Sequence, residues 1–223
     1  MERVEYTLPK EEIYPLVKKQ LENYFPALTE EEDRQLIVSV EKAIKLSINN
    51  FSKSENKYFS RIVDGERVVR FNPYHSIQWM TFLYYLSHDL YKNSSSLCDK
   101  VYYLNKIMHS VDLFYAIELP EIWSAEHPLG SVMGRAHYSN KFYFLQGCTI
   151  GGTGEMGKEV YPFLEENVCM YAHSTIVGNC HIGKNVKIGA GALVKNQDVP
   201  NNTVVFGQSP NLIFKENKNP NTI

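Results

Sequence analysis

The sequence predicts a mainly β protein with an α-helical N-terminal domain, whose β part is a left-handed parallel β-helix of hexapeptide repeats. Three observations predict this fold. Apolar residues recur every three to four positions in the first half, that period ends near Val111, and a period of six replaces it. We expect a helical domain over 1–111 with a short hairpin near 58–71, a β-helix over 112–215 and a flexible tail over 216–223.

Two helices are predicted in the first part of the chain. The first covers residues 10–25, and Pro15 is tolerated there only if it lies in the first turn. The second covers 30–49, because Thr29 and Glu32 have the spacing of a capping box, in which each side chain accepts a hydrogen bond from the other residue's backbone N–H. Apolar residues four apart then give this second helix one buried face: Leu36, Val40, Ile44 and Ile48.

A change of period marks a hairpin, which two further helices follow. Valine and isoleucine flank the pair Asp64-Gly65, and such a pair favours a tight turn between two strands. The later helices are expected over 72–91 and 97–110. The earlier of these two is rich in aromatic residues on most sides, which is typical of a buried helix.

A period of six dominates the second half. Neither a helix nor ordinary strand pairing has this period. A triangular coil with six residues per side does, because each side then places one aliphatic residue in the interior. Three sides complete one turn, so Leu164 is expected to stack on Ile182. The residues in phase are Leu164, Met170, Ile176, Ile182, Ile188 and Val194.

One insertion into the repeat contains more residues than the six that form one side of the coil. From Ile150 to Leu164 the spacing is fourteen instead of six, a surplus of eight residues. These residues, centred on the glycine-rich stretch from Gly151 to Lys158, must leave the coil as a loop. Loops extruded from a rigid scaffold often carry function, so this loop is a candidate part of the site.

Composition excludes several classes of function. A net charge of −2 leaves no excess of positive charge for a phosphate backbone or an anionic membrane, so neither nucleic acid nor a membrane is an expected partner. The longest apolar run, Trp79 to Leu86, is too short to cross a bilayer. Four cysteines and seven histidines are scattered along the chain, so we expect no metal site. Without cysteine pairs or a signal peptide, the expected location is the reducing cytoplasm.

Several motifs resemble those of the serine acetyltransferases, a family of hexapeptide-repeat acyltransferases. They are ELP at Glu118 to Pro120, the pair Glu126-His127, and the segments FLQGCTIGGTG and IGKNVKIGAGALV. The resemblance implies a homotrimer, which could pair into a dimer of trimers through the helical domains. It also implies that acetyl-CoA is the co-substrate and lies in the groove between neighbouring β-helices. Acetyl would pass from the thioester to a hydroxyl group of a small-molecule acceptor.

His127 matches the family's catalytic histidine, and the resemblance makes it the base that removes the proton of the acceptor hydroxyl. A neutral imidazole suits this task near neutral pH. The base needs an acid that fixes its tautomer. Glu118 matches that acid if one six-residue repeat is deleted, and its flanking residues favour it. Asp112 matches by counting without a gap.

The resemblance also places acetyl-CoA and the acceptor. Small residues let backbone groups approach the co-substrate closely, and a lysine suits its phosphates. The candidates for binding acetyl-CoA are Gly151, Gly152, Thr153, Ala172, Ala190 and Lys187. The candidates for binding the acceptor are Glu126, from the matching pair, and three polar or aromatic residues near the same coils that the resemblance does not assign: Tyr161, Arg135 and His173.

One departure from the family concerns the acceptor. The family carries RHP just beyond the glycine-rich loop, where its Arg and His contact serine, and this chain has Val160, Tyr161 and Pro162. Because valine cannot pair with a carboxylate, a sugar or surface-polysaccharide precursor is preferred over free serine. A genuine serine acetyltransferase is the alternative. The terminal Ile223 favours it, because the sulfhydrylase partner of that family recognises a C-terminal isoleucine. A second alternative is a non-catalytic scaffold, against which His127 and the glycine-rich loop argue.

Overall fold

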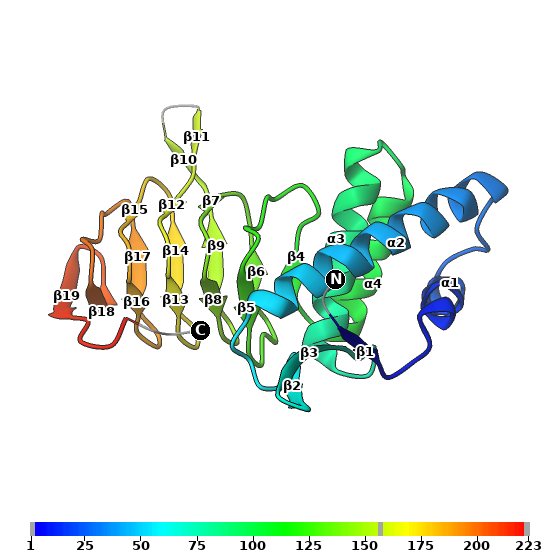
Figure 1. The fold of residues 1–223 in the computed structure, drawn as a ribbon. Coiled ribbons are helices and arrows are strands. Elements are labelled where there is room, and N and C mark those ends of the chain that lie inside the picture. The colour runs from blue at the N-terminus through cyan, green and yellow to red at the C-terminus, as the bar shows by residue number, and fades with distance from the viewer. Residues whose placement is uncertain (1–2, 156–157, 221–223) are drawn as a thin grey trace. The chain divides into compact units, whose positions relative to one another are not determined.

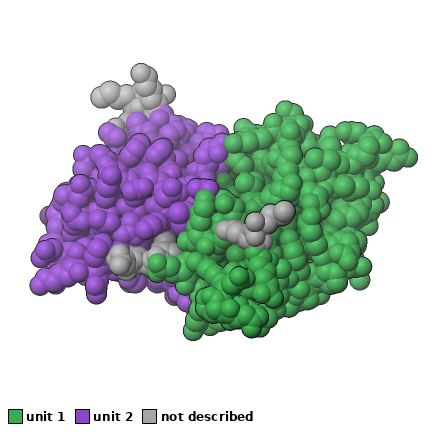
Figure 2. All heavy atoms as spheres, in the orientation of Figure 1, with its two compact units in different colours: residues 1–109, 114–116 green, residues 110–113, 117–223 purple. Residues whose placement is uncertain are grey.

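The protein folds into two compact units, which Figure 2 shows in different colours. The computed structural model describes residues 3–155 and 158–220. The first unit contains residues 1–109 and 114–116, and the second contains 110–113 and 117–223. Each unit has a hydrophobic core of its own.

Four α-helices form most of the first unit in the described part of the chain, and all four are predicted by the sequence (Figure 1). Pro15 lies in the first turn of α1, where its missing N–H costs no hydrogen bond. α2 begins with the predicted capping box, in which the Thr29 hydroxyl accepts from the Glu32 N–H at 3.2 Å and the Glu32 carboxylate accepts from the Thr29 N–H at 2.9 Å. The bounds are α1 Ile13–Tyr24, α2 Glu30–Lys53, α3 Ser76–Lys92 and α4 Leu97–His109, with a 3-10 turn, η1 Lys10–Glu12, before α1.

A three-stranded sheet accompanies these helices. Its strands are β1 Val4–Tyr6, β2 Ser60–Val63 and β3 Glu66–Phe71. β2 and β3 form the predicted hairpin, and β1 adds to β3 in parallel register. Sequence patterns did not predict β1, because three residues are too few to show a period of two. α3 is buried on most sides, as its composition predicts, and five of its large side chains are at most 1% exposed: Trp79, Phe82, Leu83, Tyr84 and Leu86.

The second unit is the predicted parallel β-helix of hexapeptide repeats (Figure 1). Its short strands stack coil on coil in three columns, which we name sides A, B and C. Side A contains β4 Asp112–Leu113, β6 Val132–Met133, β9 Thr149–Gly151, β14 Thr175–Val177 and β17 Leu193–Lys195. Side B contains β7 His137–Tyr138, β12 Phe163–Leu164 and β15 His181–Ile182. Side C contains β5 Trp123–Ala125, β8 Phe142–Phe144, β13 Cys169–Met170, β16 Lys187–Ile188 and the start of β18 Thr203–Gln208.

One buried residue per side fills the interior, as the period of six predicts. Leu164 is in register with Ile182, and Met170 is in register with Ile188. All six residues of the predicted series are 0% exposed. Upstream, Phe144 continues the column of side C, because it is in register with Met170. The period therefore reports the stacking of coils directly.

The corner between sides B and C holds backbone angles that most residues avoid. Asn167, Asn185 and Asn202 have φ of +62°, +57° and +55° there, and asparagine tolerates this left-handed conformation. Their side chains also stack. Nδ2 of Asn167 donates to Oδ1 of Asn185 at 2.9 Å, and Nδ2 of Asn185 donates to Oδ1 of Asn202 at 2.8 Å. This ladder of amides joins three successive coils.

The extra residues between Ile150 and Leu164 leave the coil as a β-hairpin, which projects from the coil in Figure 1. Its strands, β10 Thr153–Glu155 and β11 Lys158–Val160, pair antiparallel. Residues 156–157, at the centre of the predicted loop, lie outside the described residues. The prediction that this segment is extruded from the coil is confirmed on both sides of that gap.

The β-helix ends in a second hairpin, which β18 forms with β19 Asn211–Glu216. Glu216 is therefore paired in a strand, and the flexible tail predicted from 216 does not begin there. Asn217 is 8% exposed, and its Nδ2 donates to the carbonyl of Asn185 at 2.9 Å. The terminal Ile223, on which the argument for a sulfhydrylase partner rests, lies outside the described residues.

Candidate active site

His127 lies where side C turns into side A, at an exposed position with φ of +49°. Backbone hydrogen bonds stack the successive turns of this corner. The N–H of Gly130 donates to the carbonyl of Ser110 at 2.7 Å, and the N–H of Gly147 donates to the carbonyl of Leu129 at 2.9 Å. The turns form a continuous ridge that presents the imidazole to solvent. We name this ridge the His127 corner, and it contains residues 127–130, 146–147, 172–173 and 190–191.

Glu126, the residue before the histidine, is held by two residues of β8. Its backbone N–H donates to the carbonyl of Phe144 at 3.1 Å, and its carboxylate oxygen Oε2 accepts from the hydroxyl of Tyr143 at 2.6 Å. Burial, and then the neighbouring Glu126 carboxylate, raise the pKa of Tyr143 above its ordinary value, so the hydroxyl stays protonated and donates at neutral pH. A fixed carboxylate therefore directly precedes the imidazole with which the ridge begins.

The two candidate acids that could orient His127 lie at different points of the first coil. Asp112, in β4, is half-buried, and its N–H donates to the carbonyl of Ser131 at 2.8 Å, close to the end of the His127 turn. Glu118 is exposed and lies in the stretch between β4 and β5. This backbone hydrogen bond ties Asp112 to the turn that carries His127.

The spacing of the first coil bears on the same choice. Leu113 is in register with Met133 on side A, and Ala125 is in register with Phe144 on side C. The interval from Leu113 to Ala125 is twelve residues, or two repeats, so the coil keeps its phase with its full length. A deletion of one whole repeat, on which the match to Glu118 depends, also keeps this phase, so both acids stay candidates.

Three more of the predicted residues lie on the same ridge as His127. The ring of His173 packs over Gly147, because a β-carbon on that glycine would lie 2.2 Å from Nδ1 of His173. Gly147 also has φ of +64°, so the close approach and the turn both require glycine. Ala172 and Ala190 belong to the same turns of the ridge, and Ala190 is exposed. The ridge thus combines the candidate base with part of the candidate acetyl-CoA site.

Arg135 and Tyr161 lie at the next corner, where side A turns into side B. Nη1 of Arg135 donates to the Tyr161 hydroxyl at 3.4 Å and lies 3.8 Å from Oε2 of Glu159. The Tyr161 hydroxyl donates in turn to the Glu159 carboxylate. Gly152 makes room for the ring, since a β-carbon there would lie 2.7 Å from Cε1 of Tyr161. We name this the Arg135 corner, and it contains residues 134–135, 151–153, 159–161, 178–179 and 196.

The structure does not gather all of the acetyl-CoA candidates in one place. Gly151–Thr153 belong to the Arg135 corner, whereas Ala172 and Ala190 belong to the His127 corner. Lys187 lies on side C, in the strand that leads to the His127 corner. Within one chain, side A separates the two groups of candidates.

Sequence patterns missed two residues of these clusters, Tyr143 and Glu159. The alternation of side chains along a strand is a signal for Tyr143. Tyr143 precedes the buried Phe144 and Glu126 follows the buried Ala125, so both side chains face outward on side C. Glu159 lies in the extruded hairpin, where the period of six does not apply.

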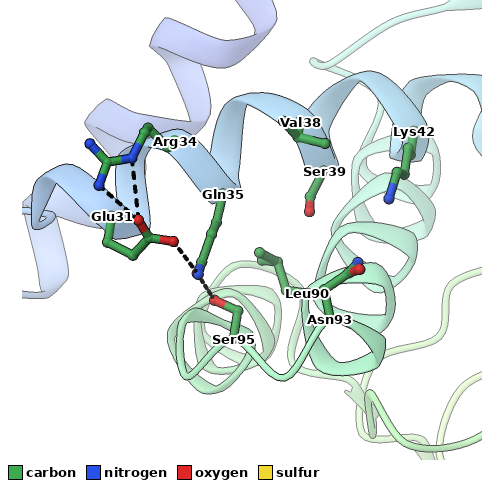
Figure 3. Close-up of a pocket in the computed structure, with 9 residues that line it drawn as sticks. All are labelled: Glu31, Arg34, Gln35, Val38, Ser39, Lys42, Leu90, Asn93 and Ser95. Carbon is green, nitrogen blue, oxygen red and sulfur yellow. Dashed lines mark hydrogen bonds and ion pairs between the residues drawn. The ribbon is translucent and has the colours of Figure 1, made fainter.

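A hollow of about 370 Å³ lies in the first unit, between α2 and the segment from α3 to α4 (Figure 3). Its charged groups are paired. Nη2 of Arg34 lies 2.8 Å from Glu31, and Nζ of Lys42 lies 3.3 Å from Asp89. None of the candidate site residues lines this hollow, so we do not place the active site there. The lining residues are Glu31, Arg34, Gln35, Val38, Ser39, Lys42, Leu90, Asn93 and Ser95.

In the described residues, no three His, Cys, Asp or Glu side chains gather closely enough to hold a metal ion. No helix in that part of the chain has the length and apolar character to span a membrane. All four cysteines are free and buried.

Curated relatives of this chain are serine acetyltransferases, although no family model matches it. The enzyme of Synechococcus elongatus is 30% identical over 132 residues, which cover 58% of this chain and 54% of the relative. The enzyme of Escherichia coli strain K12 is 34% identical over 110 residues, which cover 49% and 40%. The chain thus spans about half the length of these relatives.

Solved structures extend the likeness to nearly the whole fold. Serine acetyltransferase from Brucella abortus strain S19, in complex with coenzyme A, matches with a TM-score of 0.67 and 20% identity, covering 94% of this chain and 83% of that chain. The predicted fold class, a helical N-terminal domain followed in the chain by a left-handed parallel β-helix, is therefore confirmed. The chain is similar to the serine acetyltransferases in sequence over about half its length, and it shares their fold.

Proposed function

We propose that this protein is an acetyl-CoA-dependent O-acetyltransferase, which moves an acetyl group to a hydroxyl group of a small molecule. The observation that carries the proposal is the His127 corner, where an exposed imidazole directly follows a carboxylate that Tyr143 holds in place. The names of the relatives and the coenzyme A in the Brucella abortus structure support the same chemistry.

His127 acts as the general base in this proposal. Its neutral imidazole takes the proton of the acceptor hydroxyl while the hydroxyl oxygen attacks the carbonyl carbon of the thioester. The carbon–sulfur bond breaks, and the leaving sulfur takes the proton back from the imidazolium. The products are an O-acetyl ester and the free thiol of coenzyme A.

Asp112 is the acid that we propose as the partner of His127. Two facts support it. Its backbone N–H donates to Ser131, in the segment that closes the His127 turn, and Asp112 matches the family's acid by counting without a gap. An acid in this position fixes the tautomer of the base and stabilises the imidazolium formed during attack.

Replacing the two acids by their amides separates the alternatives. Asp112→Asn is expected to lower kcat on the order of a hundredfold, because an amide stabilises the imidazolium far less than a carboxylate does. Glu118→Gln is the matched control and should change kcat by less than about twofold, since the residue is exposed and exposed charges contribute little. Release of thiol from acetyl-CoA measures both. The opposite ranking of the two variants would assign the role to Glu118.

The proposed assembly is a homotrimer whose sites combine two chains. Within one chain, the His127 corner and the Arg135 corner lie at opposite ends of side A. A neighbouring copy that brings its Arg135 corner to the His127 corner would complete the acceptor site. The groove between the copies would then meet acetyl-CoA with Gly151–Thr153 from one side and Ala172 and Ala190 from the other. The mass of the assembly in solution distinguishes a trimer from a dimer of trimers.

Serine is the acceptor that we propose first. The relatives' names favour it, and the comparisons give no support to a sugar over serine. Val160 cannot pair with a carboxylate, but Arg135 and Glu159 offer opposite charges beside it, and such a set suits the carboxylate and the ammonium of a free amino acid. A sugar hydroxyl is the second candidate, because the Tyr161 ring could stack on a sugar.

A comparison of acceptors tests this order. Thiol release should be fastest with serine. Serinamide, which lacks the carboxylate, should show a KM about tenfold higher, because it loses one charge-assisted interaction. Arg135→Gln should remove that difference between the two acceptors. Faster turnover of a nucleotide-sugar than of serine would reverse the order. The absence of thiol release with every acceptor tested would favour the scaffold alternative.

We also propose that the protein works in the reducing cytoplasm. The four free and buried cysteines support this location, because disulfides are rare there.

A further inference from the structure

We propose that Tyr143 is a positioning residue, which holds the Glu126 carboxylate in the orientation that binds the acceptor beside His127. This inference rests on the proposed acetyltransferase activity and deepens it, because it names a side chain that sets the affinity for the acceptor. The observation is the hydrogen bond of 2.6 Å from the Tyr143 hydroxyl to Oε2 of Glu126.

The β-helix fixes the place of Tyr143. The next residue, Phe144, fills the interior at 0% exposure, so Tyr143 faces outward on side C. It is in register with Ser124 on one neighbouring coil and with Cys169 on the other. These two residues are 2% and 1% exposed, so the phenol ring stands between well-buried neighbours. A ring held in this way can serve as a rigid support for its hydroxyl group.

Glu126 is anchored to the same strand by both its backbone and its side chain. Its N–H donates to the carbonyl of Phe144, and its Oε2 accepts from Tyr143. The hydroxyl engages Oε2, so Oε1 can accept from a hydroxyl or an ammonium group of the acceptor. His127 is the next residue in the chain, so an acceptor bound by this carboxylate lies beside the base.

A fixed carboxylate binds better than a mobile one. Glu126 is exposed, and an exposed glutamate samples several rotamers that binding would have to restrict. Ordering the side chain in advance removes that loss from the binding step. Phenylalanine at 143 keeps the ring but removes the hydroxyl, so this substitution tests the hydrogen bond separately from the packing.

The test is a double-mutant cycle on positions 143 and 126 in the full-length protein. Tyr143→Phe is expected to raise the KM for the acceptor about tenfold while the KM for acetyl-CoA changes by less than about twofold. In the Glu126→Ala background, the same Tyr143→Phe change should raise the acceptor KM by less than about twofold, because the side chain that Tyr143 holds is gone.

The matched control is Tyr14→Phe in the helical unit. The Tyr14 hydroxyl also donates to a carboxylate, that of Asp33, at 2.6 Å, so this change removes the same kind of bond away from the site. It should leave both KM values unchanged. An unchanged acceptor KM in Tyr143→Phe, or an equal rise with and without Glu126, overturns the positioning role alone. A wild-type protein that transfers acetyl to no acceptor overturns the proposed function as well.

Discussion

Replacing His127 by asparagine or alanine is expected to lower turnover by a factor on the order of a hundred or more, because general base catalysis contributes about 10²–10⁴-fold. The two substitutions differ in their effect on the backbone. His127 has φ of +49°, and asparagine tolerates this left-handed conformation better than alanine does. His127→Asn thus removes the imidazole and keeps the turn. Thiol release from acetyl-CoA measures the loss, and calorimetric binding of coenzyme A checks that the site is still formed.

His181→Asn is the matched control for that experiment. His181 is also an exposed histidine of the β-helix, but it lies on side B, where its Nε2 is 2.8 Å from Glu165. Its replacement should leave turnover within about twofold of the wild type, since exposed ion pairs contribute little. Equal turnover in His127→Asn and the wild type would remove His127 from the role of base.

The largest expected loss of stability follows from Phe144→Ala. Phe144 is 0% exposed, and its ring stacks with Trp123 at 6.4 Å and Phe142 at 5.6 Å between ring centroids. Deleting a buried phenylalanine ring costs about 3–5 kcal/mol of unfolding free energy, because apolar contacts are lost and a cavity is left. Urea unfolding followed by tryptophan fluorescence measures the change, since Trp123 reports on the same cluster.

Phe163→Ala is the control at an outward position of the same β-helix. Phe163 is 44% exposed on side B, so truncation removes far less buried surface. Its unfolding free energy should fall by about 1 kcal/mol or less. Equal losses in the two variants would contradict the assignment of Phe144 to the interior column.

The period of six predicted the β-helix because each side of the coil places one residue in the interior. The period predicts that Leu164 stacks on Ile182 for this reason, and the structure confirms the pair. The same regularity located the extruded hairpin through the surplus between Ile150 and Leu164. β1 was not predicted, since no local pattern marks it. It forms by pairing with β3, a strand about sixty residues away in the chain.

The sequence predicts the candidate site less completely than it predicts the fold. The resemblance points to His127 and Glu126, but it leaves two acids open, since Glu118 matches by its flanking residues and Asp112 by counting without a gap. Tyr143 was missed because hydrogen bonds between coils join residues that are far apart in the sequence. The opposite charges of Arg135 and Glu159 meet only because the hairpin folds back to the corner.

The most direct test of the acetyltransferase proposal is the identity of the product formed from acetyl-CoA and serine by the wild-type protein. The account predicts O-acetylserine, an ester whose amino group stays free, formed together with one equivalent of free thiol and lost in His127→Asn. Formation of an amide, or of no acetylated product from serine or any sugar hydroxyl, would contradict it.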